Sequence, residues 1–136
     1  MNTSVQILEG PEGIKQAYQE SLRQPTLDIV CLAENYQTVI GNFFETTVVS
    51  QLYGAVKTRE ILPDNPANRT EAKGKDPAIN AVRFIKASAS ESDMLLWADR
   101  VVLVSFGTKP MAVCITDLEI VSSLQQQFEA LWERLG

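Results

Sequence analysis

Leu27-Asp28-Ile29-Val30-Cys31-Leu32-Ala33 is a short apolar run with almost no alternation between polar and apolar residues. A strand that is covered on both faces of a sheet has this pattern. A second run of strand type follows at 57–62, and between the two lies 36–55, whose apolar residues recur with the period of a helix. Strand, helix and strand with short joints form a βαβ unit. We therefore expect two parallel strands linked by a right-handed crossover.

The segments next to this unit predict a helix before it and a loop after it. A helical period covers 11–23, with Gly10 suited to the N-cap and Pro25 ending the helix. Residues 63–77 contain no large apolar side chain, so we expect a long loop with one helical turn at 67–72.

Beyond the loop the apolar period changes to two. Runs of strand type occupy 81–87, 94–98, 100–106 and 111–115. Turn-like breaks between them predict an antiparallel meander. The chain then ends in a helix over 118–135, where Thr116 and Glu119 fit a capping box. The expected fold is α/β, with a mixed sheet of about six strands covered by helices.

Length and charge narrow the class of protein. A chain of 136 residues can form one domain with an ordinary core. Its net charge of -5 disfavours direct contact with a phosphate backbone. We find neither a secretory signal nor a stretch apolar enough to span a membrane, and Cys31 and Cys114 both lie in apolar runs. These features predict a cytoplasmic protein with two reduced, buried thiols.

The sequence contains no histidine. This excludes a Ser-His-Asp triad, a Cys-His pair and a histidine metal site. The glycines form neither a dinucleotide-binding nor a P-loop pattern, and the acidic residues are too scattered for a metal cluster. We therefore predict a protein that is not an enzyme and has neither a cofactor nor a metal.

Two carboxylates are candidates for ligand contacts. Glu34 and Asp64 each precede an asparagine at the expected carboxyl ends of the parallel strands. Open α/β sheets bind ligands at these ends. Turns and helix caps require the same residue types, so both interpretations stay open.

Two arginines are the other candidates. Arg59 and Arg83 lie inside expected strands, where a cation on a covered face needs a partner or a ligand. The alternatives are an ion pair with Glu60 or Asp99, or an exposed sheet edge.

Four segments of the chain resemble, in order, the effector domain of TrmB-type transcriptional regulators. They are 9–18 (EGPEGIKQAY), 57–64 (KTREILPD), 98–106 (ADRVVLVSF) and 128–133 (FEALWE). The resemblance implies a three-layer domain of the phospholipase D type that has become a sensor. Family members work as dimers, several respond to sugars, and a winged helix-turn-helix usually precedes the effector domain. This chain lacks that segment, and it lacks the phospholipase D signature H-x-K-x4-D because it has no histidine.

The leading hypothesis is accordingly a non-catalytic effector domain spanning 1–136. It would bind a small, sugar-like molecule near Glu34, Arg59, Asp64 and Arg83 and act as a homodimer, with DNA contacted only through a winged helix outside this chain. Two alternatives remain: a structural dimerisation module without a ligand, and a degenerate phosphodiesterase that uses arginine and carboxylates.

Overall fold

The computed structural model describes residues 3–87 and 90–136, with the side chains of residues 50–53 excepted. Its strands are β1 (Ser4–Glu9), β2 (Thr26–Cys31), β3 (Lys57–Pro63), β4 (Asn80–Ile85), β5 (Ser92–Trp97), β6 (Arg100–Ser105) and β7 (Met111–Thr116). Its helices are α1 (Gly10–Ser21), α2 (Tyr36–Ile40), the π-helix η1 (Phe44–Leu52), the 3-10 helix η2 (Tyr53–Ala55), α3 (Pro66–Lys73) and α4 (Leu118–Arg134).

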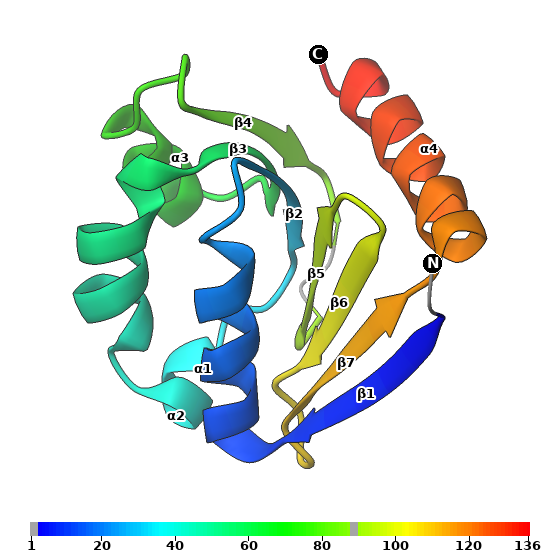
Figure 1. Ribbon diagram of the computed structural model, residues 1–136. Helices are drawn as coiled ribbons and strands as arrows, with labels where there is room; N and C mark the ends of the chain where they lie inside the picture. The colour runs from blue at the N-terminus through cyan, green and yellow to red at the C-terminus, as the bar shows by residue number, and fades with distance from the viewer. Residues whose placement is uncertain (1–2, 88–89) are drawn as a thin grey trace.

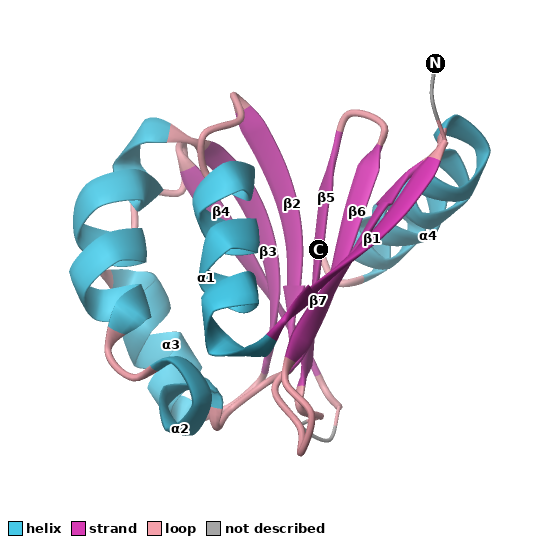
Figure 2. Ribbon diagram, turned by 60° about the horizontal axis from the view of Figure 1, so that its bottom comes forward, coloured by secondary structure: helices cyan, strands magenta, loops and turns pink. Residues whose placement is uncertain are grey.

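The seven strands form one mixed sheet in the order β1-β7-β6-β5-β2-β3-β4. Strands β2, β3 and β4 run parallel, and all other neighbours are antiparallel. The parallel βαβ unit is therefore confirmed. Helices α1, α2, η1 and α3 lie on one face of the sheet and α4 lies alone on the other, so the domain has three layers (Figure 1, Figure 2).

Two features of the sheet differ from the prediction. The strand β1, which we did not expect, precedes the first helix and makes the count seven instead of about six. The run at 81–87 becomes β4, which pairs in parallel with β3 at the far edge and takes no part in the antiparallel meander. Strand pairing is non-local, so the short connection from β4 to β5 does not make these two strands neighbours.

The single helix expected over 36–55 is broken. Gly41 follows α2 with φ +60° and ψ −139°, a left-handed conformation that favours glycine. The chain then resumes as the π-helix η1. The predicted apolar face is nonetheless buried at Ile40, Phe43 and Val48, while the side chain of Leu52 lies outside the described residues.

Helix boundaries also needed correction. Glu9, in an extended conformation, is the N-cap of α1, and Gly10 with φ +71° is the first residue of that helix. Asp117 is the N-cap of α4: its carboxylate accepts a hydrogen bond from the Ile120 backbone N–H at 2.9 Å. Thr116 belongs to β7, so the expected capping box does not form.

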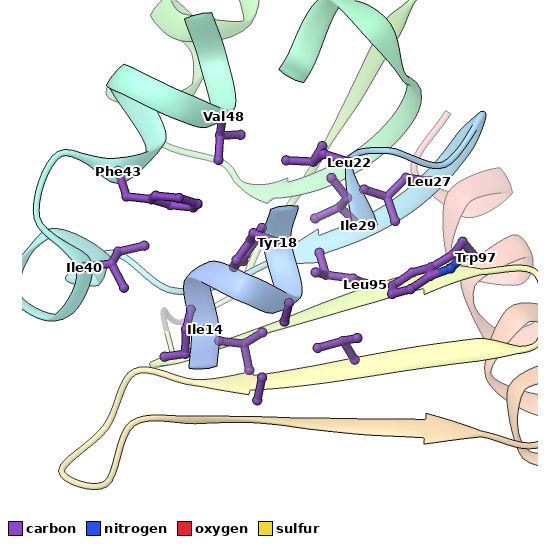
Figure 3. Packing of buried hydrophobic residues seen from close by; sticks show 14 of the residues in the cluster. Ile14, Tyr18, Leu22, Leu27, Ile29, Ile40, Phe43, Val48, Leu95 and Trp97 are labelled. Atoms are coloured by element: carbon purple, nitrogen blue, oxygen red, sulfur yellow. The ribbon is translucent and has the colours of Figure 1, made fainter. Parts of the chain in front are cut away.

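Two apolar clusters hold the layers together. The larger one packs α1, α2 and η1 on the sheet through side chains such as Ile14, Leu22, Ile29 and Leu95 (Figure 3). The other packs the predicted stripe of α4 against Ile61, Leu96 and Val101 on the opposite face; that stripe is Val121, Leu124, Phe128, Leu131, Trp132 and Leu135. Among the described helices, none has the length and apolarity that crossing a membrane requires.

A candidate ligand cavity at the carboxyl ends of the parallel strands

A cavity of about 140 Å³ lies under the helices of the larger layer. Its walls come from α1, α2, η1 and α3 and from the carboxyl-terminal halves of β2 and β3, together with the first residues of β5. The polar side chains that line it are Tyr18, Cys31, Tyr36, Glu45, Glu60, Asn68, Glu71, Lys75 and Asp93. The rest of the wall is apolar. This is the edge of the sheet at which an open α/β fold binds ligands.

Asp93 is one of two buried carboxylates of the cavity, with 5% of its surface exposed against 4% for Glu60. The hydroxyl of Tyr18 donates to its Oδ2, and the backbone N–H of Ala33 donates to its Oδ1 at 3.3 Å. Burial raises the pKa of Asp93 to about 6, although the hydrogen bonds from Tyr18, Ala33, Cys31 and Leu32 act to lower it. Within the described residues Asp93 takes part in no ion pair, so its charge is only partly compensated.

Glu60 is the second buried carboxylate, and it is held by a chain of polar groups. The ammonium of Lys75 lies 3.2 Å from Oε1 and 3.3 Å from Oε2 of Glu60. On the other side the Thr58 hydroxyl donates to Glu60 at 3.3 Å and accepts a hydrogen bond from the Asn80 amide at 2.8 Å. This network fixes the Glu60 side chain at the cavity wall.

The cavity is acidic as a whole. Among the described side chains that line it are four carboxylates and one cation, the ammonium of Lys75. Burial and nearby carboxylates, Glu45 first among them, raise the pKa of Tyr36. Such a lining accepts hydrogen bonds from hydroxyl or ammonium groups and repels anions.

The thiol of Cys31 also lines the cavity. Burial raises its pKa well above the ordinary value, and the charges of Asp93 and Glu60 add to this effect. The thiolate is the nucleophilic form of cysteine, and here it is disfavoured. Cys31 and Cys114 are both free thiols.

The four residues predicted as ligand contacts are not brought together, and none of them lines the cavity. Arg59 points to the opposite face, where its guanidinium binds Asp28 at 2.7 and 2.8 Å and Glu129 at 2.5 and 3.0 Å. These hydrogen bonds, with Glu129 first, raise the pKa of Arg59 and lower that of Glu129. The Arg59 guanidinium also lies 5.1 Å from the centre of the Phe128 ring.

The other three predicted residues have separate environments. Arg83 donates to the backbone oxygen of Trp132 and lies over its ring at 4.3 Å. Glu34 is exposed in the bend after β2. Asp64 is exposed and pairs with Arg69 at 2.6 Å, and the hydrogen bond from Arg69 lowers the pKa of Asp64.

Sequence reasoning identified the position of the cavity but not its polar residues. Side chains alternate along a strand, so Arg59 and Glu60 face opposite sides of the sheet and cannot pair with each other. Glu60, between Arg59 and Ile61 in a covered strand, indicated that the face opposite Arg59 also carries a polar group. Asp93 and Lys75 gave no comparable local signal.

Comparison with solved structures identifies the fold. The chain superposes on TrmBL2, an archaeal chromatin protein, with TM-score 0.63 and 20% identity over 98% of this chain. It superposes on NucT from Helicobacter pylori with TM-score 0.60 and 12% identity, over 97% of both chains. The phospholipase D family member Nuc from Salmonella typhimurium gives TM-score 0.57 and 14% identity, over 97% of this chain and 95% of that one.

The chain has the phospholipase-D-like fold. This confirms the fold that the resemblance implied. The match to TrmBL2, whose structure is described as showing a novel mode of DNA binding, covers 51% of that protein, so this chain spans about half of its length. No protein-family model and no curated protein matches the sequence.

Proposed function

We propose that this chain is a ligand-binding effector domain of a TrmB-like transcriptional regulator, and that it binds a small polar molecule without transforming it. The observation that supports this most strongly is the cavity at the carboxyl ends of β2 and β3, with the carboxylate of Asp93 buried in its wall. A perturbed carboxylate in a concave site at this position is typical of a binding site.

The lining of the cavity suits a neutral or cationic ligand. Glu60 and Asp93 accept hydrogen bonds from hydroxyl or ammonium groups, and the apolar wall contributed by Leu22, Val48 and Leu62 suits a carbon skeleton. The cavity of about 140 Å³ is smaller than the several hundred Å³ typical of sites for drug-sized ligands. A monosaccharide, a polyol or a small amine fits this description, whereas a phosphate ester or a dicarboxylate does not.

Two features support a role without catalysis. The sequence has no histidine, whereas the phospholipase D signature uses a histidine as its nucleophile. The raised pKa of the Cys31 thiol makes it a weak nucleophile. The polar groups of the cavity are thus suited to holding a molecule.

The proposed regulatory role takes into account the net charge of the whole chain. A net charge of -5 disfavours direct DNA binding by these 136 residues, so DNA contact is assigned to a separate winged helix-turn-helix. The ligand would act by binding one arrangement of the regulator more tightly than another.

Thermal unfolding with a ligand panel tests this function. A ligand at a hundred times its dissociation constant adds about 2.7 kcal/mol of stability, a rise of roughly 8 °C for a chain of this length. We expect such a rise with a sugar, a polyol or an amine, and none with phosphate esters or dicarboxylates. The shift should be lost in Asp93→Asn and retained in Asp99→Asn, because Asp99 lies in the turn between β5 and β6, away from the cavity.

Two results would contradict the proposal. If no compound of any class raises the unfolding temperature, the domain is a structural module. If a chromogenic phosphodiester is hydrolysed by the wild type and not by Asp93→Asn, the domain is an enzyme that uses its carboxylates.

A further inference from the structure

The face of the sheet that carries α4 is covered only in part. The helix packs on Ile61, Leu96 and Val101. Beyond it, Ile7, Val113 and Leu103 lie side by side in one row, since Ile7 pairs with Val113 and Val113 pairs with Leu103. Ile7 is 57% exposed and Leu103 is 40% exposed. The open part of the sheet beside α4 is visible in Figure 1.

Strand β1 borders this apolar row and is an edge of the sheet. Its residues Ser4 to Leu8 carry no charge and include no proline, and Val5 is 66% exposed. The outer side of an edge strand presents main-chain N–H and C=O groups without strand partners. Proteins usually protect such edges with charges, prolines or bulges, and β1 has none of these before Glu9.

A second copy of this chain fits the edge because β1 is self-complementary. In an antiparallel pair centred on Gln6, Val5 lies opposite Ile7 of the second copy, and Ile7 lies opposite its Val5. Val5 pairs with Ile115, which packs against the α4 cluster, so both apolar pairs fall on the face that carries the exposed row. The two rows then join across the symmetry axis.

A symmetric dimer requires a contact surface of a certain size. A standard interface buries ~800 Å² on each partner, about a tenth of the 7686 Å² that this chain exposes. Six residues of β1 extend ~20 Å, and the apolar row adds width to this contact. The hydroxyl of Thr3 holds the beginning of α4 beside β1 through Asp117 at 2.8 Å, so exposed Leu118 and Ile120 lie at the same end of the strand.

We infer that β1 and the adjoining apolar row of Ile7, Val113 and Leu103 form the interface of a two-fold homodimer, in which two β1 strands pair antiparallel about Gln6 and extend the sheet through both copies. The interface is isologous, because each copy contributes the same strand and the same row. It is independent of the cavity, which lies on the other face of the sheet.

Sedimentation of the whole chain over a concentration series tests the interface. We expect a reversible dimer, and Ile7→Lys should raise its dissociation constant by roughly 100-fold, since symmetry places two added charges in one apolar contact. Ile79→Lys is the matched control: Ile79 is 38% exposed and lies in the loop before β4, at the far edge, so it should not affect the dimer. A wild type that stays monomeric, or a dimer that Ile7→Lys leaves intact, overturns the inference.

Cross-linking tests the register directly and does not depend on a disruptive substitution. Gln6→Cys should give a covalent dimer with a short bis-maleimide, and Glu34→Cys, at an exposed position outside the interface, should not. Both are made in a Cys114→Ser background, because Gln6 pairs with Cys114 within one chain. Equal cross-linking at both positions would contradict the register. The outcome is separate from ligand binding, which the thermal shift measures.

Discussion

On the face under α4, the Arg59 guanidinium meets two carboxylates and two aromatic rings, whereas on the face under α1 the Asp93 carboxylate meets donors that are neutral. Both groups lie between the sheet and a helix. The Arg59 guanidinium is paired with two carboxylates, which compensate its charge. The Asp93 carboxylate keeps a raised pKa, which shows that its surroundings compensate its charge poorly.

This difference separates a structural charge from a functional one. The partly buried ion pairs of Arg59 satisfy the charges of the strands and of the helix that packs over them, and this is a structural role. A buried carboxylate beside a cavity has a cost of folding that packing does not explain, and such groups are common at binding sites. The comparison therefore supports the proposal that the face under α1 binds the ligand, while the charges under α4 serve packing.

Removing Arg59 should produce the largest effect. Arg59→Met leaves Asp28 and Glu129 without their cation, and Asp28 is 15% exposed. We expect a loss of about 2 kcal/mol in the free energy of unfolding, because the pair is partly buried and its removal leaves the Asp28 carboxylate without a cation. Urea unfolding at neutral pH measures this loss.

Arg69→Met is the matched control. The side chains of Arg69 and Asp64 are 55% and 41% exposed, and an exposed pair contributes little to stability. Equal losses in the two variants would contradict the structural role of Arg59. If the ligand still raises the unfolding temperature of Arg59→Met, Arg59 is not a ligand contact, although the sequence predicted it as one.

The elements that were predicted correctly are those with local apolar patterns. The βαβ unit and the stripe of α4 follow from periods of residues that are near one another in the chain. The break at Gly41 and the parallel pairing of β4 were not predictable in this way. The sequence does not show which φ a glycine adopts, and which strands become neighbours depends on the whole fold.

The same reasoning applies to the candidate cavity. The rule that ligands bind at the carboxyl ends of parallel strands located the cavity. It selected Glu34 and Asp64, which follow the strands, while the cavity is lined by Glu60 within β3 and by Asp93 of β5, a strand distant in sequence. Which residues of an expected strand face a cavity depends on register, and the register of β5 against β2 is set by tertiary packing.

Acidification should stabilise the protein through Asp93. Its pKa lies at about 6 in the fold and at 3.8 when unperturbed, so the folded state binds a proton that the unfolded state does not bind between these values. The free energy of unfolding should therefore rise by about 1.5 kcal/mol between roughly pH 7 and pH 5 and fall again in more acidic solution. In that more acidic range protonation reaches the carboxylates whose pKa is lowered in the fold, which are Asp64, Asp117 and Glu129. Their hydrogen bonds and ion pairs then weaken.

Asp93→Asn tests the assignment of this rise. The amide stays neutral, so the variant should show a flat profile over the same range, while Asp99→Asn keeps the wild-type profile. If the rise persists in Asp93→Asn, another group is responsible for it and the charge of Asp93 is better compensated than its geometry indicates.

The smallest expected effect concerns the start of α4, where sequence and structure name different caps. Asp117→Ala removes the acceptor for the Ile120 N–H and for the Thr3 hydroxyl, and it should lower the free energy of unfolding by a small but measurable amount. Thr116→Ala, at the position predicted from the capping box, should cost clearly less. Thermal unfolding of the two variants ranks them, and the reverse order would mean that the helix begins one residue earlier. Because the Asp117 carboxylate accepts a hydrogen bond from Thr3, the residue before β1, its loss should also weaken the proposed β1 dimer.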